Sequence, residues 1–164
     1  SYSENPDEMI DSSLQCAIDR GYIKEGDCVV ITAGVPVGKV GSTNLIKVVN
    51  VGTKLLCGVG IGKKSVTGKV CKASTVADFT EKLQKGDILV VDVLNDEYVP
   101  LAVQKAAAII AEEGGLTSST AIVGVTCGIP VLVGATNATT VLKDGQVVTL
   151  DTSGSIVYDG NINL

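Results

Sequence analysis

The apolar residues of this 164-residue chain fall into short runs that glycines interrupt. Aliphatic side chains build these runs, and aromatic residues make up only 3% of the chain. Nineteen glycines are present. β-Branched residues favour strands, and glycine favours tight connections. The pattern therefore predicts short strands joined by tight turns, around a core of Val, Ile, Leu and Ala.

Length and charge restrict the class of protein. A chain of this size forms one ordinary domain or two small units. The net charge is −5, and no basic stripe with interleaved aromatic residues is present, so we expect no nucleic-acid partner. No apolar run is long enough to cross a bilayer, and the first segment, 1–8, is polar, so we expect neither a membrane span nor a signal peptide.

The five cysteines are odd in number, and no two are spaced as a CxxC pair. Reduced thiols explain this better than a disulfide framework or a zinc site. We therefore expect a cytoplasmic protein with no metal site in this chain.

The first 51 residues predict a helix, a strand, a loop and a second strand. Asn5 can cap a helix whose first turn holds Pro6, and Gly21 ends it. The strands are expected at 28–33 and 45–51, with a loop of Gly and Pro between them. The stretch 52–62 is glycine-rich and is interpreted as a flexible junction. Its spacing does not fit a phosphate-binding loop, because Lys63 stands where such a loop needs glycine.

The remaining residues predict a second unit in which one helical layer covers strands near both ends of the segment. Neither regular alternation of helices with parallel strands nor a pure sandwich fits this pattern. An Asp-Gly turn at 143–145 indicates a hairpin. The expected strands are 65–72, 87–93, 131–133, 147–150 and 155–158, and the expected helices are 100–113 and 119–126. The domain division is thus 1–51 and 52–164.

A cluster of hydroxyl side chains follows Gly114-Gly115 and opens the short helix. Backbone N–H groups at a helix start favour an anion, so this segment is a candidate site for weak phosphate or sulfate binding. A plain N-cap would account for one or two of these residues. The acidic pairs 96–97 and 112–113 are interpreted as solvated helix ends, because adjacent residues do not face each other. The candidate anion-binding residues are Gly115, Thr117, Ser118, Ser119 and Thr120.

The segment 114–134 resembles the signature of the swivelling phosphohistidine domain of phosphoenolpyruvate-utilising enzymes. The histidine position of that signature falls on Ser119, and the arginine six residues later falls on Val125. The chain contains no histidine at all. The resemblance therefore implies the fold and argues against the family's reaction. The matching residues are Gly114, Gly115, Thr117, Gly128, Ile129 and Pro130.

Two further stretches, 26–36 and 41–48, resemble the end of the pyruvate kinase C-terminal domain. Several bacterial pyruvate kinases carry a phosphohistidine-like extension after that domain, so the order of the units agrees. The resemblance implies the α/β class: a partial C-terminal (allosteric) domain at 1–51, then a degenerate mobile domain of β/β/α swivelling type at 52–164.

The same resemblance implies a function for the whole enzyme and a limited one for this chain. Pyruvate kinase transfers phosphate from phosphoenolpyruvate to ADP with Mg²⁺ and K⁺, in a barrel of about 250 residues that this chain cannot contain. We therefore expect no catalytic residue and no cofactor here, and a role in subunit contacts, stability or allosteric response. The partners would be the rest of the pyruvate kinase chain and sister subunits. The alternative is a stand-alone phosphocarrier-like module that has lost its histidine.

The loop between the first two expected strands would be the effector-side loop of the family. Its glycines and hydroxyls are suited to contact a sugar phosphate. A loop that merely closes two strands is the simpler interpretation, since the partner loop of the pocket is not in the chain. The candidate effector-loop residues are Gly34, Pro36, Gly38, Gly41, Ser42 and Thr43.

Overall fold

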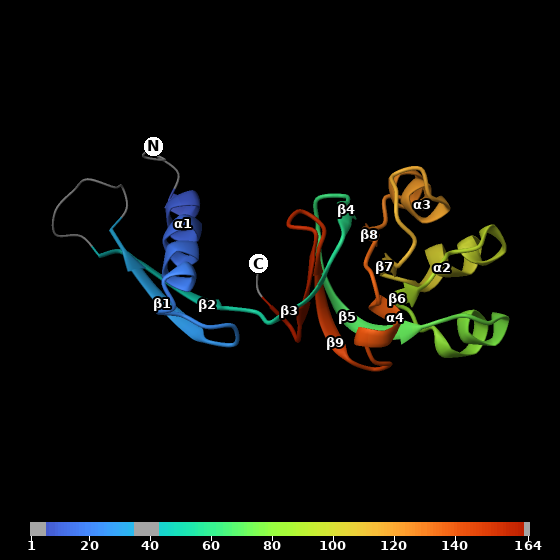
Figure 1. Cartoon of the computed structure of the whole chain (residues 1–164), viewed down its shortest axis with the longest axis horizontal. Helices are drawn as coiled ribbons and strands as arrows, with labels where there is room; N and C mark the ends of the chain where they lie inside the picture. Colours follow the sequence, from blue (N-terminus) through green and yellow to red (C-terminus); the bar gives the residue numbers. More distant parts are fainter. Residues whose placement is uncertain (1–5, 35–42, 163–164) are drawn as a thin grey trace. The chain divides into compact units, whose positions relative to one another are not determined.

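The computed structural model describes residues 6–34 and 43–162. The chain divides into two compact units, Ser1–Thr53 and Lys54–Ile162 (Figure 1). Each unit is described by itself below.

The first unit contains helix α1 (Pro6–Asp19) and strands β1 (Cys28–Ala33) and β2 (Leu45–Asn50). The two strands pair antiparallel, with Val30 opposite Val48. Along both strands exposed and half-buried residues alternate, as expected for a ribbon that is covered on one face. The predicted order of one helix and two strands is confirmed, and most of the predicted loop between the strands lies outside the described residues.

The second unit is built around four neighbouring parallel strands (Figure 1). Three of these four strands, β6, β7 and β8, are buried along their whole length. Parallel strands covered on both faces have this continuous burial. In chain order, the strands and the elements between them are β5 (Ser65–Lys72), η1 (Asp78–Lys82), β6 (Ile88–Val91), η2 (Asp96–Tyr98), α2 (Val99–Lys105), β7 (Ala108–Ala111), α3 (Ser119–Cys127) and β8 (Val131–Val133).

Antiparallel strands extend this sheet on both sides. Next to β5 lie β9 (Val147–Asp151), β10 (Ile156–Asp159) and β3 (Lys54–Cys57), in that order. Beyond β8 lies β4 (Val59–Ile61). Strands β3 and β4 occupy opposite ends of the strand order, yet only Gly58 separates them in the sequence. The eight-stranded sheet must therefore curl until its two edges meet at Gly58.

The curled sheet has two cores. On one face, η1, α2 and α3 pack against side chains such as Leu89, Val91 and Ile109. On the other face, α4 (Ala138–Val141) and strands β9 and β10 enclose side chains such as Val90 and Ile110. A helix layer, a parallel sheet and an antiparallel sheet thus follow one another, which confirms the β/β/α fold class.

Three details of the sequence interpretation are wrong. The expected helix 100–113 is helix α2 followed by strand β7, because the helix ends at Lys105 and Ala106 is extended. The Asp-Gly turn at 143–145 leads from α4 into β9, whereas the hairpin of β9 and β10 turns at 152–155, where Ser155 has a φ of 58°. Parallel neighbours also alternate with helices, contrary to the expected arrangement.

The expected flexible junction at 52–62 is wrong as well, because this segment contains β3 and β4. Its glycines serve close packing. A Cβ on Gly58 would lie 2.5 Å from the carbonyl oxygen of Val133, and one on Gly60 would lie 2.0 Å from that of Thr152. Both distances are shorter than any van der Waals contact. Glycine is therefore required where the two edges of the sheet meet.

Candidate functional site

The predicted anion-binding segment lies at the carboxyl end of β7, where the chain turns into α3. Ser118 has extended backbone angles, and its Oγ accepts a hydrogen bond of 3.2 Å from the Ala121 amide. Ser118 is therefore the N-cap of α3, which is the simpler of the two interpretations for this residue. The helix ends at Gly128, which has a φ of 67°.

The other hydroxyl groups of this segment differ in their surroundings. Thr117 is exposed and Ser119 is half-buried, whereas Thr120 is fully buried. Among the side chains that the structure describes, only Thr120 Oγ1 and Glu113 Oε2 are buried polar atoms without a hydrogen-bond partner. Glu113 directly precedes the glycine pair, and its negative charge opposes anion binding there. Anion binding at this segment stays a prediction.

The acidic pair at 112–113 does not solvate a helix end, because it follows strand β7 instead of a helix. Glu112 Oε1 accepts hydrogen bonds from the backbone amide of Thr139, at 2.8 Å, and from its hydroxyl. This carboxylate therefore ties the end of β7 to the first turn of α4.

The effector-loop candidates fall mostly outside the described residues. Pro36, Gly38, Gly41 and Ser42 lie there, and Gly34 and Thr43 flank the segment. The Asn44 amide donates to the carbonyl of Ala33 at 3.1 Å, which closes the ends of the two strands. An effector role for this loop stays a prediction.

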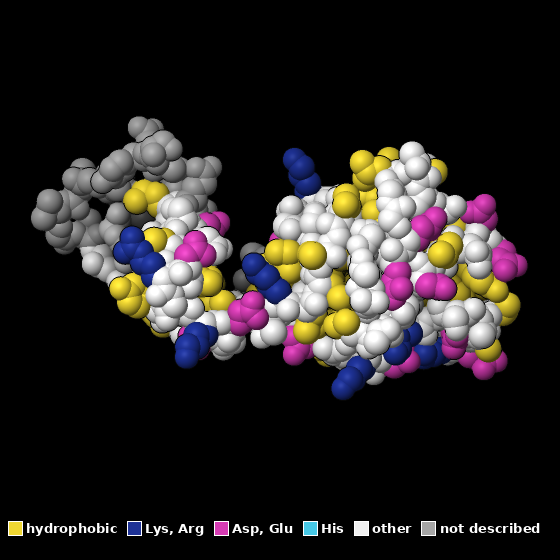
Figure 2. All heavy atoms as spheres, in the orientation of Figure 1, with side chains coloured by type: hydrophobic (Ala, Val, Ile, Leu, Met, Phe, Trp, Pro, Cys, Tyr) yellow, Lys and Arg dark blue, Asp and Glu magenta, His cyan; other side chains and the backbone are white. Residues whose placement is uncertain are grey.

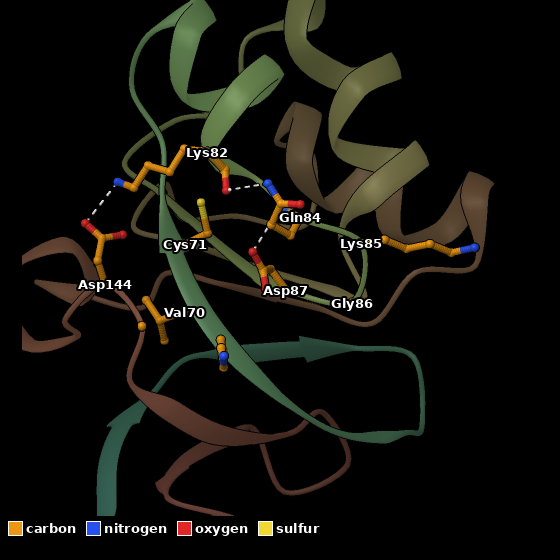
Figure 3. Close-up of a pocket in the computed structure, with 10 residues that line it drawn as sticks. Val70, Cys71, Lys82, Gln84, Lys85, Gly86, Asp87 and Asp144 are labelled. Atoms are coloured by element: carbon orange, nitrogen blue, oxygen red, sulfur yellow. Dashed lines mark hydrogen bonds and ion pairs between the residues drawn. The ribbon is translucent and has the colours of Figure 1, made fainter.

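A polar pocket that the sequence did not indicate lies where β5 exchanges its partner β9 for β6 (Figure 3). Its volume is about 500 Å³. Residues of β5, the segment 82–87 and the turn at 144–145 line it. No motif marks this pocket in the sequence, since its residues come from distant segments that only the fold brings together.

An ion pair at 2.9 Å between Lys82 Nζ and Asp144 Oδ2 spans this pocket (Figure 3). Lys82 Nζ also donates to the Lys72 carbonyl at 2.6 Å, and the Lys72 amide donates to Asp144 Oδ1 at 2.8 Å. Partial burial alone raises the pKa of Asp144, but these hydrogen bonds outweigh it and lower that pKa below its usual value. The ion pair and these hydrogen bonds therefore link η1, β5 and the α4–β9 turn.

The pocket offers no activated nucleophile. Cys71 is only 3% exposed, and its side chain lies between Lys82 and Gln84 (Figure 3). Burial raises the pKa of this thiol, so its thiolate form is disfavoured near neutral pH. Lys85 points away from the other labelled side chains. The arrangement is therefore suited to binding or bracing and not to covalent catalysis.

The described residues hold no group of three or more His, Cys, Asp or Glu side chains that would bind a metal ion. In the same part of the chain, no helix combines the length and the apolar character needed to cross a membrane. On the face shown in Figure 2, lysines lie among acidic side chains without gathering into a basic patch.

Comparison with known proteins finds a similarity for part or all of each unit. The family model for the pyruvate kinase alpha/beta domain matches residues 1–49, and that for the mobile domain of PEP-utilising enzymes matches residues 83–154. A pyruvate kinase from Geobacillus stearothermophilus is 50% identical over 96% of this chain. This sequence is homologous to the C-terminal region of bacterial pyruvate kinases. A pyruvate kinase from Lactobacillus delbrueckii subsp. bulgaricus is 42% identical over 97% of the chain.

The homologous region spans 27% of the length of each of these two pyruvate kinases. Among solved structures, Thermococcus kodakaraensis aconitase X aligns at a TM-score of 0.49 and 19% identity, over 65% of this chain and 98% of that chain. A similarity this low supports no inference about this chain.

Proposed function

We propose that this chain is a non-catalytic region of a pyruvate kinase that acts through subunit contacts, stability or allosteric response. The observation that carries the proposal is the 50% identity to a pyruvate kinase over 96% of this chain, within 27% of that relative's length. The reaction itself would belong to the remainder of the protein. There it would transfer phosphate from phosphoenolpyruvate to ADP, with Mg²⁺ and K⁺ as cofactors, in the cytoplasm.

The mobile-domain scaffold supports a role without phosphoryl transfer. Ser119 occupies the position at the start of α3 that holds histidine in the family resemblance, and Val125 occupies the arginine position. A serine hydroxyl is a weak nucleophile without an adjacent base, and this chain has no histidine to act as that base. A phosphocarrier role for the isolated chain is therefore the weaker alternative.

The outer face of the β1–β2 ribbon supports contacts with further protein. The exposed fractions of Val30, Ile46 and Val48 on this face are 60%, 72% and 58%. A two-stranded sheet is marginally stable on its own in water, and a continuous exposed apolar face marks an interaction surface. We assign this face to contact with the rest of the pyruvate kinase chain or with a sister subunit.

The proposal is tested with the complete natural protein and a shortened form that ends at Thr53. Steady-state kinetics with phosphoenolpyruvate and ADP should show turnover in both forms. Thermal stability, subunit assembly or the response to sugar-phosphate effectors should differ between them. A folded, assembled shortened form that has lost all turnover would assign a catalytic role to the second unit. Identical stability, assembly and effector response in both forms would refute the supporting role.

A further inference from the structure

A second polar cavity lies at the carboxyl ends of β5 and β6 and has a volume of about 470 Å³. Its position is significant because the elements around it cover opposite faces of the sheet. Helix η1 packs on the face of Leu89 and Val91, whereas α4 packs on the face of Val90. The cavity is therefore bounded by elements from both faces of the sheet.

The charged side chains of this cavity carry no net charge. Lys72 and Lys82 supply two ammonium groups, and Asp78 and Asp92 supply two carboxylates. The polar side chains of Ser74 and Thr139 complete the lining. Within the described part of the chain, none of the four charged groups forms an ion pair with another of the four, since Lys82 pairs with Asp144. Lys72, Asp78 and Asp92 thus share one cavity with no ion pair among them, whereas Lys82 is already paired with Asp144.

These groups keep hydrogen-bonding capacity after their contacts within the protein. Lys72 Nζ donates to the Thr139 carbonyl at 3.1 Å, which leaves two of its three N–H groups for a ligand. Asp92 Oδ1 accepts from the Val93 amide at 2.8 Å, and Oδ2 has no partner among the described residues. The cavity therefore presents at least one donor centre and one acceptor centre.

Asp78 is held in place as an anion. Its Oδ2 accepts from the amides of Ser74 and Thr75 at 2.9 and 3.0 Å. These two hydrogen bonds, with a third from the Thr75 hydroxyl, lower the pKa of Asp78 below its usual value. The negative charge opposite the lysines is therefore permanent near neutral pH.

The charge arrangement selects the class of ligand. A phosphate or a dicarboxylate would meet two aspartates, and a divalent cation would meet two ammonium groups. An apolar ligand would desolvate the charged groups and pair with none of them. A small molecule with a carboxylate and an ammonium group satisfies both halves of the cavity through charge-assisted hydrogen bonds.

We propose that this cavity binds a zwitterion of the α-amino-acid type, with its carboxylate on Lys72 and its ammonium group on Asp92. This inference goes beyond the role of the chain in pyruvate kinase and does not depend on it. Asp78 supplies the second negative charge of the acidic half.

The test is an NMR amide titration of the complete chain with glycine as the probe, at constant ionic strength. We expect a saturable shift of the Ala73, Ser74, Val93 and Thr139 amides, with a dissociation constant on the order of 1 mM. N-acetylglycine lacks the ammonium group and glycinamide lacks the carboxylate. Each should bind at least about 10-fold more weakly, because each loses one charge-assisted hydrogen bond.

Two variants locate the contacts. Asp92→Asn and Lys72→Met should each weaken glycine binding about 10-fold, since each removes one charge from the proposed site. Asp96→Asn, on the exposed helix η2, should leave binding unchanged. Amide spectra check the fold of each variant. If a variant does not fold, the comparison of glycine with N-acetylglycine and glycinamide decides the outcome.

Three results would overturn the proposal. One is the absence of a saturable shift with glycine up to about 100 mM, a hundred times the expected dissociation constant. Another is binding of N-acetylglycine or glycinamide as tight as that of glycine, which would indicate a simple anion or amine site. The third is unchanged glycine affinity in folded Asp92→Asn or Lys72→Met.

Discussion

Replacing Gly60 with alanine tests the curled sheet of the second unit. The new Cβ would lie 2.0, 2.7 and 2.8 Å from the carbonyl oxygen, carbonyl carbon and Cα of Thr152. Ordinary van der Waals contact needs about 3.5–4.0 Å, so the backbone of β4 or of the 152–155 turn must move by more than about 1 Å. No flexible side chain can absorb this shift, because all three atoms belong to the backbone.

The displaced segment carries several hydrogen bonds. The Gly60 amide donates to Ser155 Oγ at 3.0 Å. Thr152 bonds to Lys64 through its amide at 3.0 Å and through its hydroxyl at 2.9 Å. Loss of two such bonds costs about 2 kcal/mol. Steric overpacking adds about 1–3 kcal/mol to this loss of stability. Alanine also lowers the entropy of the unfolded chain, which offsets about 0.4–1 kcal/mol of the loss.

The expected net loss for Gly60→Ala is therefore about 3 kcal/mol in the free energy of unfolding, a large share of a typical domain's stability. For a unit of this size the loss corresponds to about 10–15 °C in Tm. The assay is urea unfolding followed by far-UV circular dichroism, together with hydrogen exchange at the amides of β4 and β8.

Gly114→Ala is the matched control. Its nearest neighbour would be the Cα of Gly134 at 3.8 Å, which is ordinary contact. This variant should stay within about 0.5 kcal/mol of the unmodified chain, as do most substitutions without steric conflict. A Gly60→Ala variant as stable as the unmodified chain would refute the close packing, and so would a Gly114→Ala variant destabilised equally.

Four other outcomes are expected. Asp144→Asn should lower stability at pH 7 by about 0.5 kcal/mol, since both side chains of this ion pair are partly exposed to solvent. Because the folded pKa of Asp144 lies below its unfolded value of about 3.9, the deficit should vanish in urea titrations as the pH falls through that lowered pKa, and a deficit that persists in acid would contradict this cause. Ellman's reagent should modify four cysteines quickly in the native chain and Cys71 only after unfolding, so equally fast reaction at all five would disprove its burial. Ile46→Ser should leave the fold of this chain intact but weaken subunit assembly of the complete protein, as measured by analytical ultracentrifugation; unaltered assembly would remove the β1–β2 face from the contacts. Phosphate should shift the amide resonances of Ser119 and Thr120 with a dissociation constant of about 1 mM. If these resonances do not shift, the hydroxyl groups of the 117–120 segment serve only to cap the helix.

The local signals of the sequence located most elements whose ends carry marked residues. Pro6 lies in the first turn of α1, Ser118 caps α3, and Gly128 ends it in the left-handed region. These features act within a few residues of the chain, so the sequence alone reveals them. The serine at position 119 was likewise visible as a replacement for the histidine of the resembling family.

The sequence could not separate α2 from β7. The run 106–111 consists of Ala and Ile, which also fits a helical stripe. Strand β7 is buried on both faces, so it lacks the alternation that distinguishes a strand from a helix. Tertiary burial decides the outcome there, and no local pattern records it.

The glycines at 58 and 60 were misinterpreted for a similar reason. Flexible junctions and close backbone approaches both use glycine, and the difference lies in residues distant in sequence. Val133 and Thr152 supply the approaching backbone. The Lys82–Asp144 ion pair was not predicted, because the two residues are 62 positions apart in the sequence and no motif connects them.

A coupled assay of pyruvate formation from phosphoenolpyruvate and ADP, with Mg²⁺ and K⁺, tests whether this chain is a non-catalytic part of a pyruvate kinase. It would compare this chain with the complete natural protein from which the sequence derives. We expect turnover by the complete protein and none by this chain above a mock-purified control. Turnover by this chain alone, or none by the complete folded protein, would contradict it.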